Sequence, residues 1–532
     1  MVISSYELFK HFKEHSLSEF FRKNKQMLGF VGKVRTLTMI VHELVTNSLD
    51  ACEEAGILPE VKVEIEKVRQ ETYRVTVEDN GPGIPYEYIP KVYGKMLAGT
   101  KFHRYMQMRG QQGLGASAVT LYAQMTTGEP VYVISRYRAP DGRLLEARMK
   151  VKIDVRRNEP EVLETELREL EEGSTGVRVS ACVGEVLYQR GEQGPYEYLR
   201  RTAIVNPHAR ILLREPDGSL QVFERSVHEV IRPPKETKPH PLGVSADDLL
   251  FICQASTRRT VRAVFLYDFV RISSQKIKEI EEELKKLGKA EILDKKPQEL
   301  TFEEAELLVS IFRKLKFYAP PLNVLRPLGE DYIRRSLASI LKPEFVYAVT
   351  RKPKVYWGGV PFLVEGGIAY GGGAGRSGEL EIMRFANNVP LLFDSSACLL
   401  TREVKEFNWK SYGLSRIDSL PVTIMLHVVS VHVPYTSAGK QAIAEVPEIK
   451  KEVHLLLASL ARKLSDYLRL KKKLEKLEKQ KQLLEKIAPL VSESLAAITG
   501  YSKEQLSSAL ENLIKKKFAE LEEMKKKLGV VE

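Results

Sequence analysis

The strongest constraint on the fold comes from a stretch near the C-terminus that predicts a single long helix. Between Pro447 and Ala488 the only proline is Pro447, which would occupy the first helical turn, where proline is tolerated. Such a helix would reach about 60 Å, and Pro489 is expected to end it. Its charged residues account for a solvated outer face, but an apolar stripe predicts that it packs on a partner or projects as a lever. The stripe repeats at a spacing of about 3.5 and consists of Tyr467, Leu470, Leu474, Leu477 and Leu484.

Two proline clusters divide the rest of the chain. The sequence has 532 residues, more than one ordinary core accommodates. IRPPKETKPHPLGV (231–244) and YAPPLNVLRPLGE (318–330) read as boundaries between domains. The sequence therefore predicts an α+β multidomain protein whose segments are 1–232, 233–318, 319–488 with the long stalk helix, and a Lys-rich helical tail, 489–532.

The periodicity within these segments predicts their layers. Residues 1–232 mix helices with alternating strands, which predicts a sheet covered by helices on one side. The expected helices are 4–21 and 37–56, and the expected strands are 61–68, 73–79, 131–137, 147–155 and 176–183. Residues 233–318 have helical patterns only. In 319–446, strand patterns recur at 345–352, 361–373, 390–394 and 421–435.

Composition narrows the function classes. The net charge is +12 and the pI about 9.2, which suggests a polyanionic partner such as nucleic acid, although a Lys-rich tail could also produce this balance. Cys52, Cys182, Cys253 and Cys398 are far apart and form no CxxC pair, which favours a reducing compartment, the cytoplasm, over a disulfide framework or a zinc site. The N-terminus has no apolar signal region, and no apolar run approaches the roughly 18 residues of a membrane span.

A polar stripe follows the expected helix 37–56. In HELVTNSLDA, Glu43 and Asn47 are four residues apart and Asp50 lies three further on, so all three point to similar faces. Apolar residues cover the remaining circumference. The stripe predicts either a solvated helix face or a polar face that is turned toward a ligand.

EDNGPGIP (78–85) adds a second feature. Its first part predicts a strand that ends at Asp79, where a carboxylate can accept a hydrogen bond from an exocyclic amine such as adenine N6. Gly81 and Gly83 would let a flat ring approach the backbone closely. An ordinary β-turn has the same composition.

Two further segments follow in order. RGQQGLGASA (109–118) places Gly110, Gly113 and Gly115 before a helical pattern, and backbone N–H groups in such a turn form an anion site. It matches neither the P-loop nor the Rossmann fingerprint. EEGSTGVRVS (171–180) then offers Thr175 at the entrance to a strand.

The four features together, in this order, resemble the GHKL ATPase family. The family includes gyrase B subunits, MutL-type mismatch-repair proteins, chaperones of the ninety-kilodalton heat-shock class and histidine kinases. The resemblance implies a Bergerat α/β sandwich that binds ATP and Mg²⁺. In the implied roles, Glu43 is the general base for the attacking water, Asn47 the Mg²⁺ ligand, Asp50 a supporting residue and Asp79 the adenine contact, with Gly81 and Gly83 making room for the ring.

The resemblance also implies a phosphate lid. Gln111 and Gln112 are unusual there and are expected to donate side-chain amides to the γ-phosphate. The family often has Gly-Thr before the last strand, whereas this chain has Ser174, Thr175 and Gly176, so the turn around the Thr175 hydroxyl is altered. The implied lid residues are Thr100, Lys101, Gly110, Gln111, Gln112, Gly113, Leu114, Gly115, Ala116 and Ser117.

The remainder of the chain is similar to one branch of this family, the B subunits of type IIB DNA topoisomerases (topoisomerase VI). A histidine kinase would lack so long a continuation, and gyrase B would continue into an acidic metal-binding domain. The helical segment resembles a helix-two-turns-helix domain, and the similarity extends over roughly residues 1–488. Its pieces include PPLNVLRPLGED (320–331), RFANNVPLLFD (384–394) and NWKSYGL (408–414).

This resemblance implies an ATP-gated strand-passing machine. Two B subunits would dimerise on ATP, trap double-stranded DNA and act with a separate A subunit that carries the cleaving tyrosine, in an A2B2 assembly. Lys410 would contact the duplex backbone, with Trp409 and Tyr412 holding its loop; an exposed aromatic turn is the alternative. Lys440, between the last strand and the long helix, matches the switch lysine that contacts the γ-phosphate, although a loop lysine can also have no role.

Two other function classes stay open. One is a MutL-like mismatch-repair clamp that closes on ATP without strand passage, against which the helical segment and the WKxY run weigh. The other is a non-catalytic DNA-binding scaffold with a degenerate ATP site, against which the intact Glu43 and Asn47 weigh.

Overall fold

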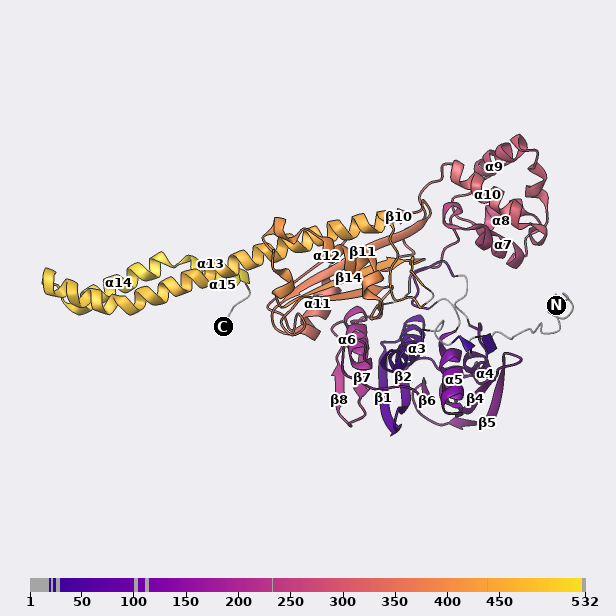
Figure 1. The fold of residues 1–532 in the computed structure, drawn as a ribbon, viewed down its shortest axis with the longest axis horizontal. Helices are drawn as coiled ribbons and strands as arrows, with labels where there is room; N and C mark the ends of the chain where they lie inside the picture. Colours follow the sequence, from indigo (N-terminus) through magenta and orange to yellow (C-terminus); the bar gives the residue numbers. More distant parts are fainter. Residues whose placement is uncertain are drawn as a thin grey trace, which may run out of the picture.

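Two β-sheets form the body of the molecule, with a helical cluster at one end and a helical hairpin projecting from the other (Figure 1). The computed structural model describes residues 19–20, 23–24, 29–99, 104–110, 114–231, 233–437 and 439–528, with the backbone alone at 522 and 526–528. None of the described helices combines the length and the hydrophobicity needed to cross a membrane.

The first sheet has eight strands in the order β5-β4-β3-β6-β2-β1-β7-β8. Burial alternates along β1 and β3, because only one face of the sheet is covered by helices. The strands are β1 (Glu60–Arg69), β2 (Thr72–Asp79), β3 (Val131–Arg138), β4 (Leu144–Asp154), β5 (Glu159–Leu170), β6 (Gly176–Val183), β7 (Arg210–Arg214) and β8 (Leu220–Phe223). The covering helices are α3 (Lys33–Glu54), α4 (Ile89–Gly94), α5 (Gly115–Thr126) and α6 (Pro195–Val205).

The alternating patterns located this sheet well. The five predicted strands correspond to β1, β2, β3, β4 and β6, and the predicted helix 37–56 is α3. The predicted helix 4–21 falls almost wholly outside the described residues. Strand β5 was not predicted because it is exposed at nearly every position, so its charged sequence has no apolar period.

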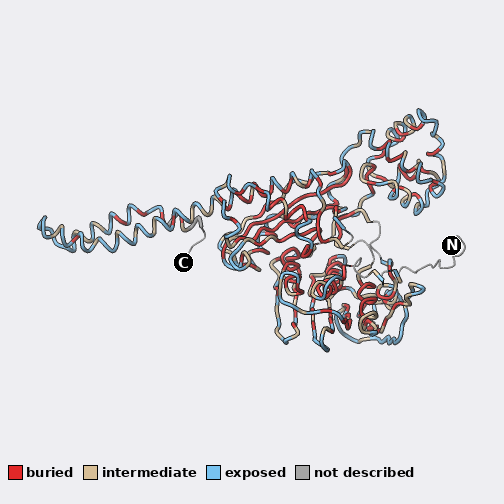
Figure 2. Tube along the Cα trace, in the orientation of Figure 1, coloured by how far each residue is buried: buried red, intermediate tan, exposed pale blue. Residues whose placement is uncertain are grey.

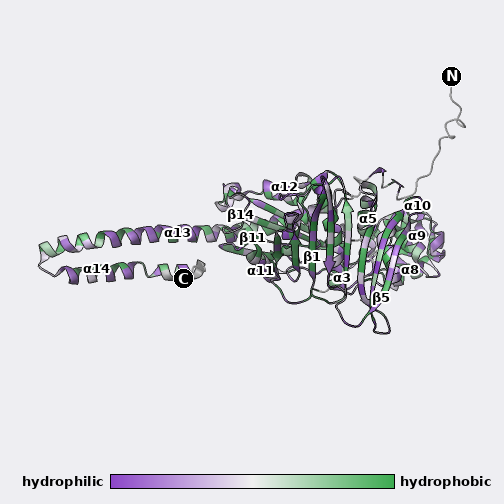
Figure 3. Cartoon of the chain, turned by 90° about the horizontal axis from the view of Figure 1, so that it is seen from below, coloured by the Kyte–Doolittle hydropathy of each residue, from purple (hydrophilic) through white to green (hydrophobic). Residues whose placement is uncertain are grey.

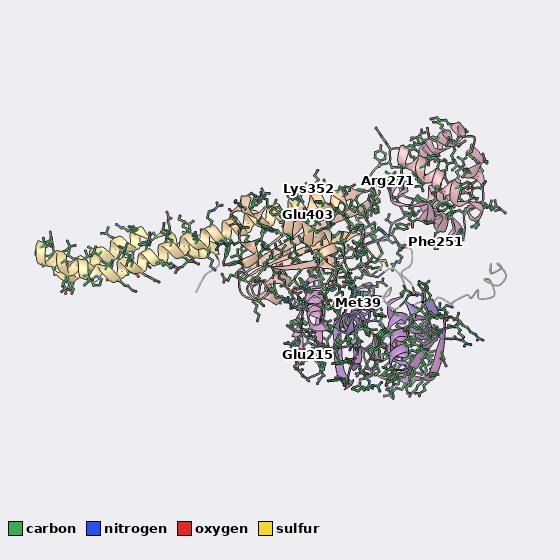
Figure 4. The ribbon with its side chains drawn as sticks, viewed as in Figure 1. Met39, Glu215, Phe251, Arg271, Lys352 and Glu403 are labelled. Atoms are coloured by element: carbon green, nitrogen blue, oxygen red, sulfur yellow. The ribbon has the colours of Figure 1, made fainter. Side chains whose placement is uncertain are left out.

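A second core belongs to the helical domain, which we define as α7 (Ala246–Ala255), α8 (Val261–Asp268), α9 (Ser274–Lys286) and α10 (Phe302–Lys314). Phe265 and Phe312 meet edge to face at 5.2 Å in its centre. Arg271, which lies between this domain and the second sheet in Figure 4, donates from Nε to the Ala319 carbonyl at 2.8 Å. The predicted all-helical character is confirmed, with α8 as an additional helix.

The second sheet has six strands, with β10-β11-β14-β12-β13 in order and β9 also paired to β11. Strands β11 and β14 are buried at nearly every position because helices cover both faces (Figure 2). Helices α12 (Leu399–Glu406) and α13 (Pro447–Thr499) cover one face, and α11 (Glu330–Leu341) covers the other together with α6 from the first layer. The strands are β9 (Phe345–Thr350), β10 (Lys354–Tyr356), β11 (Val360–Tyr370), β12 (Glu381–Ala386), β13 (Val389–Pro390) and β14 (Val422–Ser430).

The strand predicted at 390–394 is wrong beyond Pro390. Leu391, Leu392 and Phe393 leave the sheet and are all buried. Leu392 and Phe393 join the core of the first sheet, whereas Leu391 joins that of the second. The hydrophobicity of this segment therefore reflects packing between two layers, which a single-segment pattern cannot distinguish from a strand.

Helix α13 (Pro447–Thr499) is longer than the sequence predicted, because Pro489 does not end it. A proline inside a helix costs about 3 kcal/mol, and the hairpin offsets this cost by packing. Helices α14 (Lys503–Lys517) and α15 (Glu520–Leu528) fold back along α13 (Figure 3). The predicted apolar stripe thus packs within the chain, and the buried residues of this contact are Leu474, Ile514, Phe518, Leu521 and Met524.

Buried polar contacts join the two layers. Glu381 of β12 accepts from Arg200 at 2.8 Å and from Arg201 at 3.1 Å, both on α6. Met39 of α3 lies at the boundary of the layers in Figure 4, and its sulfur accepts from the Gln441 side-chain amide at 3.8 Å. The loop that precedes α13 is therefore fixed against α3.

Candidate nucleotide-binding site

Glu43 and Asn47 lie one turn apart on α3, on a face that the rest of this helix avoids. From Val34 to Glu53, Asn47 is the single exposed residue, and Glu43 is partly exposed. Neither side chain has a hydrogen-bond partner among the described residues. The Nε2 atom of His42 lies 3.9 Å from Oε1 of Glu43. An amide and a carboxylate without partners on a largely buried helix leave room for a ligand.

Lys440 reaches the same place from the second layer. It lies in the loop between β14 and α13, where Gln441 contacts α3. Burial lowers the pKa of Lys440 below the ordinary lysine value, while the nearby Glu43 carboxylate opposes this shift. No hydrogen-bond acceptor for its ammonium group exists among the described residues. The fold thus brings a carboxylate and a cation from two layers to one space.

The start of α5 lies directly against this carboxylate. A Cβ atom at Gly115 would collide with Oε2 of Glu43, so no larger residue fits there without moving Glu43. Leu114 provides no side-chain cap for the helix, which leaves its first N–H groups available to an anion. Ala116 and Ser117 are buried, and the Ser117 hydroxyl donates to the Leu114 carbonyl at 3.1 Å, so these two residues offer backbone rather than side-chain groups.

Asp79 ends β2 beside α3 and is held firmly. Its Oδ2 accepts from the Ser48 hydroxyl at 2.8 Å, and its Oδ1 accepts from the N–H groups of Gly81 at 2.9 Å and Val177 at 3.2 Å. Burial raises the pKa of Asp79 above the usual aspartate value, against the effect of these hydrogen bonds. Thr175 immediately precedes β6, whose Val177 makes one of the contacts, so it lies close to Asp79 in the fold.

The two glycines after Asp79 have different environments. A Cβ atom at Gly81 would lie 3.0 Å from Oδ1 of Asp79 and 3.4 Å from Sγ of Cys52, so Gly81 borders the aspartate. Gly83 has φ of +79°, and a Cβ atom there would collide with the Arg136 carbonyl of β3. The fold alone therefore requires glycine at position 83, with no ligand needed to explain it.

Arg109 was not predicted and is the main anchor beneath the site. Its guanidinium donates to Asp50 at 2.6 Å, to both oxygens of Glu53 at 2.8 and 2.6 Å, and to Asn206 at 2.5 Å. Burial alone would lower its pKa, but the two carboxylates raise that pKa above the ordinary arginine value. Asp50, the last residue of the polar stripe, therefore binds Arg109 beneath the site. The only signal in the sequence was the position of Arg109 immediately before the glycine-rich run.

Several predicted lid residues are not described by the structure. Thr100, Lys101, Gln111, Gln112 and Gly113 lie outside the described residues. Gly110 and Leu114, which flank part of this segment, are both described and partly exposed.

The WKxY run lies on the second layer. Trp409 is buried, and its indole N–H donates to the Val404 carbonyl at 2.8 Å. Tyr412 stacks on Phe407 with ring centroids 5.6 Å apart. Lys410 lies between them and is exposed. An exposed aromatic turn is therefore wrong for Trp409, and the two aromatic residues hold a loop that presents a lysine.

Two family models match the sequence. One, described as histidine kinase-, DNA gyrase B- and HSP90-like ATPase, covers residues 32–175, and the other, described as the transducer of the topoisomerase VI B subunit, covers residues 320–481. The ATPase region of Saccharomyces cerevisiae topoisomerase II is structurally similar with a TM-score of 0.40, at 11% identity over 86% of this chain and 99% of that chain.

Curated relatives are similar over almost the whole chain. The B subunit of type 2 DNA topoisomerase 6 from Pyrococcus horikoshii is 47% identical over 558 residues, with 97% of each chain covered. The protein of the same name from Thermococcus gammatolerans is 46% identical over 555 residues, covering 97% of this chain and 98% of the relative. That of Methanothermobacter thermautotrophicus is 47% identical over 491 residues, or 92% of each chain.

Proposed function

The chain belongs to the family of type 2 DNA topoisomerase 6 B subunits, and from this membership and the site geometry we propose how its residues use ATP. It is an ATP-dependent type II DNA topoisomerase subunit with a GHKL nucleotide-binding fold. We propose that Glu43 and Lys440 act on the γ-phosphate of ATP, and that their state gates the passage of duplex DNA.

The observation that carries this proposal is the meeting of three unpartnered polar groups. The Glu43 carboxylate, the Asn47 amide and the Lys440 ammonium have no hydrogen-bond partners among the described residues, and Gly115 holds α5 against Glu43. A triphosphate would supply acceptors for the lysine and for the N–H groups of α5. Asn47 would hold Mg²⁺ through its amide oxygen, and the ion would neutralise phosphate charge.

Each residue then has a step in hydrolysis. Asp79 accepts a hydrogen bond from the adenine amine and orients the base. Glu43 takes the proton of the attacking water, and Lys440 stabilises charge on the γ-phosphate oxygens. Thr100, Lys101, Gly110, Gln111, Gln112 and Gly113 complete the phosphate contacts, and Thr175 lies beside Asp79.

Lys440 would also connect the nucleotide site to helix α13. It lies in the loop that leads into α13, so its engagement with phosphate would fix the angle of that helix relative to α3. We propose that ATP dimerises two copies of the chain around a duplex. The hairpin of α13 to α15 would carry the motion to an A subunit that cleaves DNA, in an assembly of two A and two B subunits.

The experiment that tests this function is decatenation of linked circular DNA. The chain is mixed with an A-type subunit shown to co-purify with it, with and without ATP, beside the Glu43→Ala variant. Unlinking by the wild-type protein with ATP, and by no other sample, supports strand passage. Nucleotide-driven dimerisation on DNA without any unlinking would contradict it and favour a MutL-like clamp.

Lys410 is the proposed contact to the duplex backbone. The neighbouring Tyr412 lines a surface hollow together with Arg462, Arg469 and Lys472 of α13, which gives this loop a basic surrounding. Replacing Lys410 with alanine is expected to weaken duplex binding equally for all sequences. The slope of log K against log salt should fall in magnitude by about one, because about one counterion fewer is released.

A salt titration of duplex binding measures this slope. Lys67→Ala is the matched control, since Lys67 is an exposed lysine on β1 of the first sheet. An unchanged slope in the Lys410 variant would exclude the backbone contact.

A further inference from the structure

The short segment that leads into the glycine-rich run is held by distant parts of the chain. In residues 104–110, Tyr105 forms a β-bridge with Thr237 in the connection to the helical domain. Arg104 donates to Glu54 of α3 at 3.2 Å. The segment therefore lies where the first layer and a connection to the helical domain meet.

Gln107 is buried at the centre of this segment, and both polar atoms of its side chain form hydrogen bonds. Its side-chain oxygen accepts from the Arg326 N–H at 2.6 Å, and its side-chain amide donates to Oδ1 of Asn388 at 2.9 Å. Its backbone N–H donates to the Val324 carbonyl at 3.3 Å. One glutamine thus joins the segment before the glycine-rich run to residues 324–326, which precede α11, and to the β12–β13 turn.

The turn that receives Gln107 is itself rigid. Asn387 and Asn388 both have positive φ, 47° and 63°, which asparagine tolerates better than most residues. The Asn387 amide donates to the Met108 carbonyl at 3.0 Å, so the turn holds two successive residues of the segment. The N–H of Asn388 donates to Nε2 of His427 in β14 at 2.9 Å.

The same turn also holds the first layer. The Asn388 amide donates to the Val205 carbonyl at the end of α6 at 2.8 Å, and its carbonyl accepts from the Asn206 amide at 3.2 Å. Asn206 in turn accepts from Arg109, which bonds to Asp50 and Glu53 of α3. A continuous chain of buried hydrogen bonds therefore runs from the second sheet to the helix that carries Glu43 and Asn47.

We propose that Gln107 and the Asn387–Asn388 turn are positioning residues for the nucleotide site. They set the direction in which the chain enters Gly110, so the second sheet and the phosphate-binding segment keep one relative position. This inference rests on the proposed role of Gly110 and of Leu114 to Ser117 in phosphate binding. It predicts an effect on ATP that exceeds the effect on ADP, since the proposed function places the γ-phosphate beside Glu43 and Lys440.

The test compares nucleotide use by Gln107→Leu and Asn388→Gly with the wild-type chain. Leucine keeps the volume but leaves the Arg326 N–H and the Asn388 oxygen without partners, and glycine keeps the positive φ while removing the side chain. Each variant is expected to raise the KM for ATP about tenfold and to change the ADP dissociation constant less than about twofold. The effects of the two changes on the KM for ATP should be less than additive in the double variant, because both remove the Gln107–Asn388 contact.

Ser336→Ala is the matched control. The Ser336 hydroxyl donates to the Ile204 carbonyl at 2.7 Å, a buried hydrogen bond between the same two layers to which no residue of 104–110 contributes. The Tm of Ser336→Ala should fall by about as much as the Tm of the Gln107 and Asn388 variants, with no change in the KM for ATP. If the Gln107 and Asn388 variants behaved like Ser336→Ala, or weakened ATP and ADP equally, the positioning role would be wrong. If the wild-type chain itself bound no ATP, the proposed function would fail instead.

Discussion

Replacement of Glu43 with alanine is expected to lower the rate of ATP hydrolysis by about 10²–10⁴-fold, the range that general bases contribute. ATP binding should persist, because the proposed adenine contact at Asp79 and the N–H groups at the start of α5 are untouched. The proposed nucleotide-driven dimerisation should therefore remain while turnover stops. Steady-state phosphate release, together with calorimetric binding of ATP, measures the two effects separately.

Two further variants test whether the Glu43 carboxylate itself is required for hydrolysis. Glu43→Gln keeps the shape and should be equally slow, because an amide cannot take a proton from water. Glu87→Ala removes an exposed carboxylate in the same layer and should hydrolyse ATP normally. Hydrolysis at the wild-type rate by either Glu43 variant would show that another group acts as the base.

Replacement of Lys440 with alanine is expected to reduce hydrolysis by about 10²–10³-fold, the effect of losing one preorganised charge donor. The Tm should change little, because the ammonium has no hydrogen-bond acceptor among the described residues and its burial is unfavourable. Parallel measurements of kcat and Tm test both statements. Decatenation with an A subunit should be lost together with hydrolysis.

Two further variants distinguish the positive charge of Lys440 from its position in the chain. Lys440→Arg retains the cation and should recover part of the rate, whereas Lys451→Ala removes an exposed lysine of α13 and should have no effect. If Lys440→Ala hydrolysed ATP normally but failed in decatenation, the lysine would act in transmission alone and the proposed phosphate contact would be wrong.

The elements that carry Glu43, Asn47 and Asp79 were predictable because these residues lie in short motifs. Glu43 and Asn47 are separated by one helical turn, and Asp79 ends a strand with a clear alternation. Arg109 and Ser48, which hold Asp50 and Asp79, were not predicted, since each acts through a partner distant in sequence. A sequence pattern reports spacing along one element, and these contacts join separate elements.

The sequence by itself determined the order of the motifs and those elements whose burial is periodic, because periodic burial leaves a period in the residues that form a helix or strand. Only the tertiary structure decided where α13 ends, where Leu391 to Phe393 pack, and that Gln107 meets Asn388 across 281 residues. Pro489 remains within a helix because α14 and α15 pack along it. Such outcomes depend on the free energy of contacts between distant segments, and local propensity carries no record of those contacts.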